Sequence, residues 1–152
     1  MKTIYIITGA PNDRKSSSIR ALTGVHDGKS FDVEINGTTE YVFVMTTSPN
    51  EVKSKSLPHG ISPSELIKLI KGLKKETKII LPIRLIKPLH ELPTAEEYIK
   101  VLHHAGYEIA PVAMYNSNVS LPNGVHGTLI NNTRTIPANK LASKLRKLWS
   151  FS

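Results

Sequence analysis

The stretch that most constrains the fold is a strand-to-helix junction near the start of the chain. The apolar run Ile4–Ile7 predicts a buried strand that stops at Gly9. From Lys15 to Leu22 the residues suit a helix. Gly24 is placed to end that helix, because glycine readily takes the left-handed conformation found after a helix C-terminus. The sequence therefore predicts a strand, a loop and a helix in succession.

The loop within this junction has the spacing of a phosphate-binding loop. Gly9 is followed after five residues by Lys15 and Ser16, close to the pattern G-x-x-x-x-G-K-S/T. In such a loop, backbone N–H groups and the helix N-terminus face an anion, and the lysine adds a positive charge. Arg14 stands at the second glycine of the pattern, where its side chain would either obstruct phosphates or pair with them. An ordinary strand-to-helix connection is the competing interpretation.

Composition favours one globular domain over residues 1–152, long enough to bury a sizeable core. Hydrophobic residues make up 39% and charged residues 21%, which is typical of a folded rather than a disordered chain. The lack of cysteine excludes a disulfide framework and thiolate metal sites. No apolar run is long enough for a signal peptide or a membrane span, so we expect a cytoplasmic protein.

The net charge of +8 favours an anionic partner, which includes a nucleotide, a nucleic acid or an acidic protein. The excess lies in three clusters, at residues 53–55, 68–78 and 140–147. Solvated helix faces explain each cluster equally well. Aromatic residues are only 6% of the chain and show no pattern that would supply stacking platforms for bases.

An antiparallel hairpin is predicted at about residues 30–46. Ser30–Ile35 alternates apolar and polar residues, as a half-buried strand does. Asn36 and Gly37 then form the dipeptide most typical of a tight hairpin turn. The return strand, Glu40–Met45, is largely apolar and suits a more central place in the sheet.

Helix and strand signals alternate along the rest of the chain. The predicted elements are a helix from a capping box at Ser62, a strand over 78–83, a helix over 94–105, a strand over 107–115, a short strand over 126–130 and a basic helix from Pro137. This order predicts an α/β fold, a three-layer sandwich with a mostly parallel central sheet, one antiparallel hairpin and helices on both faces.

These features resemble the P-loop NTPase superfamily and, within it, the small GTPase-like branch. Lys15–Gly24 is similar to the segment of bacterial GTPases in which Gly-Lys-Ser-Ser precedes an apolar helix ending in Leu-Thr-Gly. The Asn36-Gly37 hairpin stands where those proteins have theirs. Val44–Pro49 falls where their apolar strand would end in Asp-Thr-Pro-Gly. Beyond residue 51 the resemblance is one of element order.

The resemblance implies a site for a nucleoside triphosphate with Mg²⁺. Gly9 would make the turn, Lys15 would contact the β- and γ-phosphates, and Ser16 would bind Mg²⁺. Backbone N–H groups from Asp13 to Ser17 would surround the phosphates. The implied phosphate-binding residues are Gly9, Asp13, Arg14, Lys15, Ser16 and Ser17.

Three hallmarks of the family are missing. Thr46 stands where the family has its metal-binding aspartate, so Asp27 or Glu51 would have to serve the metal. No Asp-x-x-Gly follows that strand to order a γ-phosphate switch. No Asn-Lys-x-Asp is present to select guanine, although Asn116 and Asn118 lie near the expected strand end.

We therefore expect a nucleotide- or phosphate-binding P-loop protein with weakened or lost hydrolysis. One alternative is a non-enzymatic interaction protein that uses a degenerate P-loop scaffold to bind nucleic acid or an acidic partner. A second is a small P-loop kinase whose substrate is held by Arg84, Lys87 or the loop after Met45. No catalytic residue is assigned, because Ser16–Ser18 have no identifiable base and the six histidines lack metal-ligand spacing.

Overall fold

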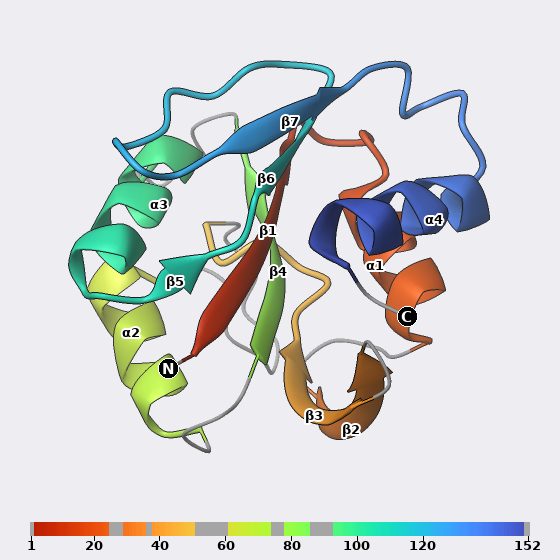
Figure 1. Cartoon of the computed structure of the whole chain (residues 1–152). Helices are drawn as coiled ribbons and strands as arrows, with labels where there is room; N and C mark the ends of the chain where they lie inside the picture. Colours follow the sequence, from red (N-terminus) through yellow and green to blue (C-terminus); the bar gives the residue numbers. More distant parts are fainter. Residues whose placement is uncertain are drawn as a thin grey trace.

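In the computed structural model, a mostly parallel sheet forms the middle layer of the fold (Figure 1). The structure describes residues 2–24, 29–35, 38–50, 61–73, 78–85 and 93–150. The strands are β1 (Thr3–Gly9), β2 (Lys29–Ile35), β3 (Thr38–Val44), β4 (Lys78–Arg84), β5 (Glu108–Ile109), β6 (Val112–Tyr115) and β7 (Gly127–Ile130). The helices are α1 (Lys15–Thr23), α2 (Pro63–Lys71), α3 (Ala95–His104) and α4 (Ala138–Trp149).

β1 occupies the middle of the sheet. The strand order is β2-β3-β4-β1-β6-β7, and β5 pairs with β1 outside this path. The parallel register of β1 and β4 runs from Ile4 opposite Ile79 to Gly9 opposite Arg84. The pairs β3–β4, β1–β6 and β6–β7 are also parallel. The carboxyl ends of these strands therefore meet at one edge of the sheet, where ligands of open α/β sheets usually bind.

Helices cover both faces of the sheet, as the sequence predicts. Alternate residues of β1 point to opposite faces. Ile4 and Ile6 join the apolar cluster that contains the buried residues of α2 and α3. Tyr5 and Ile7 join the cluster that contains Ile19 of α1 and the apolar side of α4, which comprises Leu141, Leu145 and Trp149. The three-layer α/β sandwich is confirmed (Figure 1). Within the described ranges, no helix combines the length and the apolar composition that a membrane span requires.

The predicted hairpin is confirmed. β2 and β3 pair antiparallel from Lys29 opposite Val44 to Ile35 opposite Thr38. The turn residues, Asn36 and Gly37, lie outside the described residues. β3 continues into the sheet through its parallel pairing with β4, so the hairpin forms one end of the sheet.

Local capping signals begin and end the helices where the sequence predicts. Ser62 Oγ accepts from the Glu65 N–H at 3.2 Å, and Glu65 Oε1 accepts from the Ser62 N–H at 3.0 Å, which completes a capping box at the start of α2. Thr94 caps α3 through the Glu97 N–H. Gly24 ends α1 in the left-handed conformation, with φ 70°.

The strand predicted over 107–115 is two strands, and in this respect the prediction is wrong. β5 and β6 both pair with β1 but are separated at Ala110 and Pro111. Proline has no N–H to donate, so the ladder of hydrogen bonds is interrupted there. The short strand predicted over 126–130 is confirmed as β7.

Candidate phosphate-binding site

The candidate site lies where β1 runs into α1 at the carboxyl edge of the sheet. Gly9 ends β1 and packs closely against its surroundings. A β-carbon at this position would lie 3.2 Å from the Cβ atoms of both Asp13 and Tyr115. Contacts this short are tighter than most, so a larger residue here would require Asp13 and Tyr115 to shift by a few tenths of an ångström.

Two residues of the loop have left-handed backbone conformations. Asn12 has φ 70°, and Arg14 has φ 69° and ψ 25°. Asparagine tolerates this region, whereas it costs about 1–2 kcal/mol for a residue such as arginine. Arg14 is the position at which the phosphate-loop pattern has its second glycine. The loop therefore takes a backbone conformation that glycine would supply without strain, and surrounding contacts must hold it.

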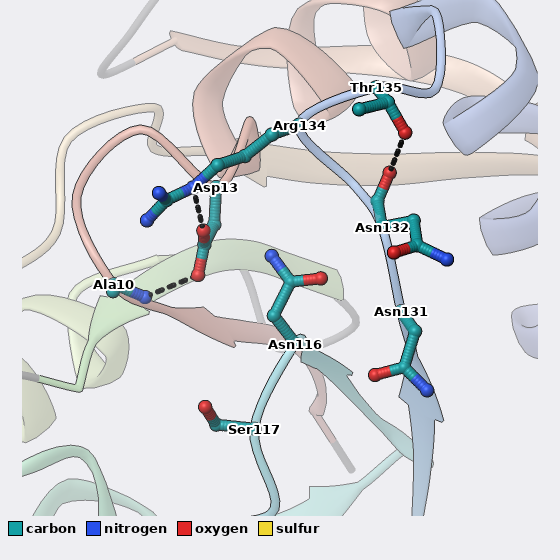
Figure 2. A pocket seen from close by; sticks show the side chains of 8 residues that line it. All are labelled: Ala10, Asp13, Asn116, Ser117, Asn131, Asn132, Arg134 and Thr135. Carbon is teal, nitrogen blue, oxygen red and sulfur yellow. Dashed lines mark hydrogen bonds and ion pairs between the residues drawn. The ribbon is translucent and has the colours of Figure 1, made fainter.

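The Asp13 carboxylate holds the loop from inside. Its side chain is almost fully buried, because Asp13 is only 2% exposed. Oδ2 accepts from the Ala10 N–H at 2.8 Å, and Oδ1 accepts from Arg134 Nε at 2.8 Å (Figure 2). Arg134 Nη2 also donates to the Pro11 carbonyl at 3.3 Å. The loop is thus tied to a residue that lies far along the chain.

A second link connects the loop to the ends of β6 and β7. Thr133 Oγ1 donates to the Asp13 carbonyl at 2.8 Å and accepts from Asn116 Nδ2 at 2.9 Å. The Thr133 N–H in turn donates to Asn116 Oδ1 at 3.2 Å. Both polar atoms of the Asn116 amide are therefore engaged by Thr133, so this residue acts as a support for the loop.

The first turn of α1 carries the lysine and serines of the predicted loop. Lys15 is 7% exposed, and its ammonium donates to the Ala10 carbonyl at 2.9 Å. The Ser16 hydroxyl donates to the Thr46 carbonyl. N–H groups in a first helical turn have no carbonyl partner within the helix, and the helix dipole adds partial positive charge. The first turn of α1 contains no acidic residue that would offset this charge.

Tyr115 supports α1 from β6. Its hydroxyl donates to Ser18 Oγ at 2.8 Å, and the Ser18 hydroxyl donates to the Arg14 carbonyl at 2.7 Å. Burial raises the pKa of Tyr115 to about 12, and the hydrogen bond with Ser18 offsets part of this effect. The phenol therefore remains protonated at neutral pH and continues to donate.

Loop residues and the end of β4 enclose a hollow of about 350 Å³, which we call the loop hollow. It is lined by Pro11, Asn12, Arg14, Lys15, Ser16, Ser17 and Arg84. Four of the six predicted phosphate-binding residues thus come together, and they are Arg14, Lys15, Ser16 and Ser17. Gly9 and Asp13 do not line the loop hollow. Arg84 joins the set because it pairs in register with Gly9, a placement that only the sheet order reveals.

Arg84 is one of three residues at this edge with a buried polar atom that lacks a hydrogen-bond partner within the described chain. The atoms are Thr8 Oγ1, Ser48 Oγ and Arg84 Nε. Thr8 is 0% exposed and Ser48 is 1% exposed. Buried polar groups nearly always have a partner in protein or water. All three residues lie at or just beyond the carboxyl ends of β1, β3 and β4, and all three can donate a hydrogen bond.

Asn50 fixes the backbone at Arg84. Its Nδ2 donates to the Arg84 carbonyl at 2.8 Å, and its Oδ1 accepts from the Arg84 N–H at 3.2 Å. Asn50 is itself fully buried. The sequence gives no sign of this role, because Asn50 follows β3 whereas Arg84 ends β4, 34 residues further along the chain.

A second hollow, of about 640 Å³, lies on the other side of β1. Figure 2 shows its lining of amide and hydroxyl groups around the Asp13–Arg134 ion pair, and the residues are Ala10, Asp13, Asn116, Ser117, Asn131, Asn132, Arg134 and Thr135. We call it the amide hollow. Both hollows border the same loop. Sequence reasoning singled out Asn116 but missed the residues after β7, for which the Asn-rich run Asn131-Asn132 is the available signal.

The described residues do not by themselves make a magnesium site. Mg²⁺ is usually bound by one or two carboxylates together with phosphate oxygens and water. No carboxylate is found among the described residues that line the loop hollow, and the Ser16 hydroxyl is engaged by Thr46. Asp27 and Glu51, the metal ligands suggested by the sequence, lie outside the described residues, as does Lys87. Within the described residues, no group of three or more histidine or acidic residues is placed to hold a metal ion.

Comparison with protein-family models, with curated proteins and with solved structures gave no match to this chain. The resemblance to P-loop NTPases therefore depends on the residues quoted above, and it stays a prediction.

Proposed function

We propose that this chain binds the phosphate groups of a nucleotide or a similar phosphate-bearing ligand in the loop hollow. The observation that carries the proposal is the convergence of three cationic residues, Arg14, Lys15 and Arg84, at the N-terminus of α1. Guanidinium groups, an ammonium and a helix N-terminus each favour a phosphate, and together they form a strongly anion-attracting surface.

A nucleoside triphosphate is the ligand that the shape of this edge favours. The loop hollow can take the charged phosphates, and the adjoining amide hollow can take a sugar and base. Pockets for small molecules usually measure about 300–1,000 Å³, and the amide hollow measures about 640 Å³. The side-chain amides of Asn131 and Asn132 offer both donors and acceptors to polar edges of a ligand.

Hydrolysis is expected to be weak or lost. Activation of water for attack on a phosphate requires a group that positions it or accepts its proton. The described lining of the loop hollow contains cations and hydroxyls but no such base. The arrangement therefore supports binding more strongly than turnover.

The kinase alternative has one observation in its favour. Arg84, which the sequence offers as a substrate-holding residue, lies in the same hollow as Lys15. Incubation with labelled ATP and a panel of nucleosides and nucleotides tests this alternative, and a lack of phosphoryl transfer to all of them would reject it.

Thermal unfolding with pyrophosphate, ATP, GTP and their diphosphates, each with and without Mg²⁺, tests the main proposal. A ligand at one hundred times its dissociation constant stabilises by about 2.7 kcal/mol, which raises the melting temperature by several degrees. We expect such a shift for pyrophosphate and for at least one triphosphate. We expect Lys15→Ala and Arg84→Ala each to weaken it.

Lys78→Ala is the matched control, because Lys78 begins β4 at the end away from the loop hollow. This variant removes one positive charge without touching the loop hollow, so the ligand-induced shift should persist. An unchanged shift in Lys15→Ala, or an equal loss in Lys78→Ala, would contradict the proposed site.

A further inference from the structure

Acidic and basic residues are unevenly divided along the chain. Every Asp and Glu lies at or before Glu108, and residues 109–152 contain none. The same segment contains the basic residues Arg134, Lys140, Lys144, Arg146 and Lys147. The positive charge of the chain is therefore least compensated in its C-terminal third.

The three lysines of this segment form an outward row on α4. Lys140, Lys144 and Lys147 follow one another at intervals of four and three residues, which places them on one side of the helix. All three are exposed. α4 packs beside α1 (Figure 1), and Arg20 of α1 is also exposed. We call this surface the α1–α4 face, and neither of its two helices contains an acidic residue.

The opposite side of α4 anchors the helix firmly to the sheet. Leu141, Leu145 and Trp149 are buried in the cluster with Tyr5 of β1. The rings of Trp149 and Tyr5 lie 5.3 Å apart, and Trp149 Nε1 donates to the Pro111 carbonyl at 2.8 Å. The packing of α4 therefore fixes the position of the helix that carries the three exposed lysines.

The helices on the other face of the sheet are different, because their charges are mixed. On α2, Glu65 precedes Lys68 by three residues. Hydrogen bonds from Ser62 lower the pKa of Glu65 most, and the positive charge of Lys68 lowers it further. On α3, Glu96 and Glu97 precede Lys100 by four and three residues. Like charges four residues apart, such as Lys140 and Lys144, destabilise a helix. No acidic residue of α1 or α4 offsets the repulsion between these lysines.

We infer that the α1–α4 face binds the phosphate backbone of double-stranded nucleic acid without sequence preference. Lysine and arginine neutralise phosphates and release their counterions, which supplies most of the affinity in such binding. The face offers Arg20, Lys140, Lys144 and Lys147 for four phosphate contacts. This inference is independent of the loop hollow and of the proposed nucleotide binding.

Other anionic partners fit this face less well. A helix that binds a lipid surface needs a free apolar side, but the apolar side of α4 is buried. Single strands and protein partners usually engage exposed aromatic residues. The described part of the chain has one exposed large hydrophobic residue, Leu129, and it belongs to β7.

Titration of a labelled duplex of about 20 base pairs between 50 and 200 mM salt tests the inference. Four phosphate contacts predict a slope of log K against log salt of about −3.6, which is roughly a 100-fold loss of affinity over this range. The double variant Lys140→Gln/Lys144→Gln should reduce the slope by about two. Lys15→Ala should bind the duplex as the parent chain does, which separates this surface from the nucleotide site.

Lys68→Gln/Lys71→Gln is the matched control, because it removes the same charge from exposed positions of α2 on the opposite face. Unchanged duplex binding in this control, with weakened binding in the α4 double variant, supports the inference. No duplex binding at 50 mM salt, or equal weakening in both double variants, would overturn it. Tighter binding to anionic vesicles or to polyglutamate than to the duplex would also overturn it.

Discussion

Exchange of Arg14 for glycine and for alanine tests whether the loop is strained at this residue. Arg14 has φ 69°, a conformation that costs a residue with a β-carbon about 1–2 kcal/mol. Glycine avoids this cost but loses about 0.4–1 kcal/mol through the greater freedom of its unfolded chain. Arg14→Gly should therefore be more stable than Arg14→Ala by about 0.5–1 kcal/mol, or roughly 1–4 °C in melting temperature for a chain of this size.

The comparison isolates the β-carbon, because both variants lose the 3.3 Å hydrogen bond from Arg14 Nε to the Arg134 carbonyl. Ala21→Gly gives the opposite sign as a control. Ala21 lies on the exposed side of α1, where glycine costs about 1 kcal/mol relative to alanine. Urea unfolding of these variants measures each difference. An Arg14→Ala variant at least as stable as Arg14→Gly would refute the strain argument.

The same two variants decide what the Arg14 side chain does to a phosphate. The proposed site has Arg14 pairing with the phosphate, so both variants should bind pyrophosphate more weakly than the parent chain. Tighter binding by both variants would show that the Arg14 side chain obstructs the loop hollow instead. Calorimetric titration of pyrophosphate distinguishes these alternatives, which the sequence leaves open.

Three further predictions concern residues that support the site. Gly9→Ala should lower the free energy of unfolding by about 1–3 kcal/mol in urea, because the new methyl group would crowd Asp13 and Tyr115. Asp13→Ala should cost about 1.5–3 kcal/mol in the same assay, since the buried carboxylate accepts from Ala10 and Arg134; a loss below 0.5 kcal/mol would show that these bonds do not hold the loop. Burial raises the pKa of Tyr115 from 10 to about 12. The protonated phenol therefore contributes fully to the free energy of unfolding below pH 10, and this contribution falls as the pH rises toward 12. Between pH 10 and 12, the free energy of unfolding should fall by on the order of 2 kcal/mol less in Tyr115→Phe than in the parent chain. Parallel pH profiles of the two proteins would contradict this assignment.

Local chemistry made much of the fold predictable. The hairpin, the capping box at Ser62 and the stop at Gly24 each depend on a few neighbouring residues, whose side chains or backbone freedom act within one turn. The break at Pro111 also has a local cause. The sequence does not predict this break, because the apolar run on both sides of the proline has the pattern of one continuous strand.

The candidate site was predictable only in part, because it is assembled from distant segments. The loop residues Arg14 to Ser17 could be recognised from their spacing. The position of Arg84 beside them follows from β4 lying next to β1, and strand order is set by the packing of the whole sheet. The ion pair of Asp13 with Arg134 joins residues 121 positions apart, and no short-range sequence pattern predicts such a contact.

The same long connections affect how the protein acquires its site during synthesis. β1 leaves the ribosome before both of its flanking strands, because β4 ends at Arg84 and β6 ends at Tyr115. The Thr133 hydroxyl that binds the Asp13 carbonyl follows it by 120 residues, which takes roughly 6–24 s at ordinary translation rates. β4 and β6, which pair with β1, are made before Thr133, but until Thr133 is made the loop that follows β1 lacks the hydrogen bond from this residue to Asp13. A nascent chain arrested before Thr133 should therefore be open to protease within residues 10–14, and one that extends past α4 should resist it.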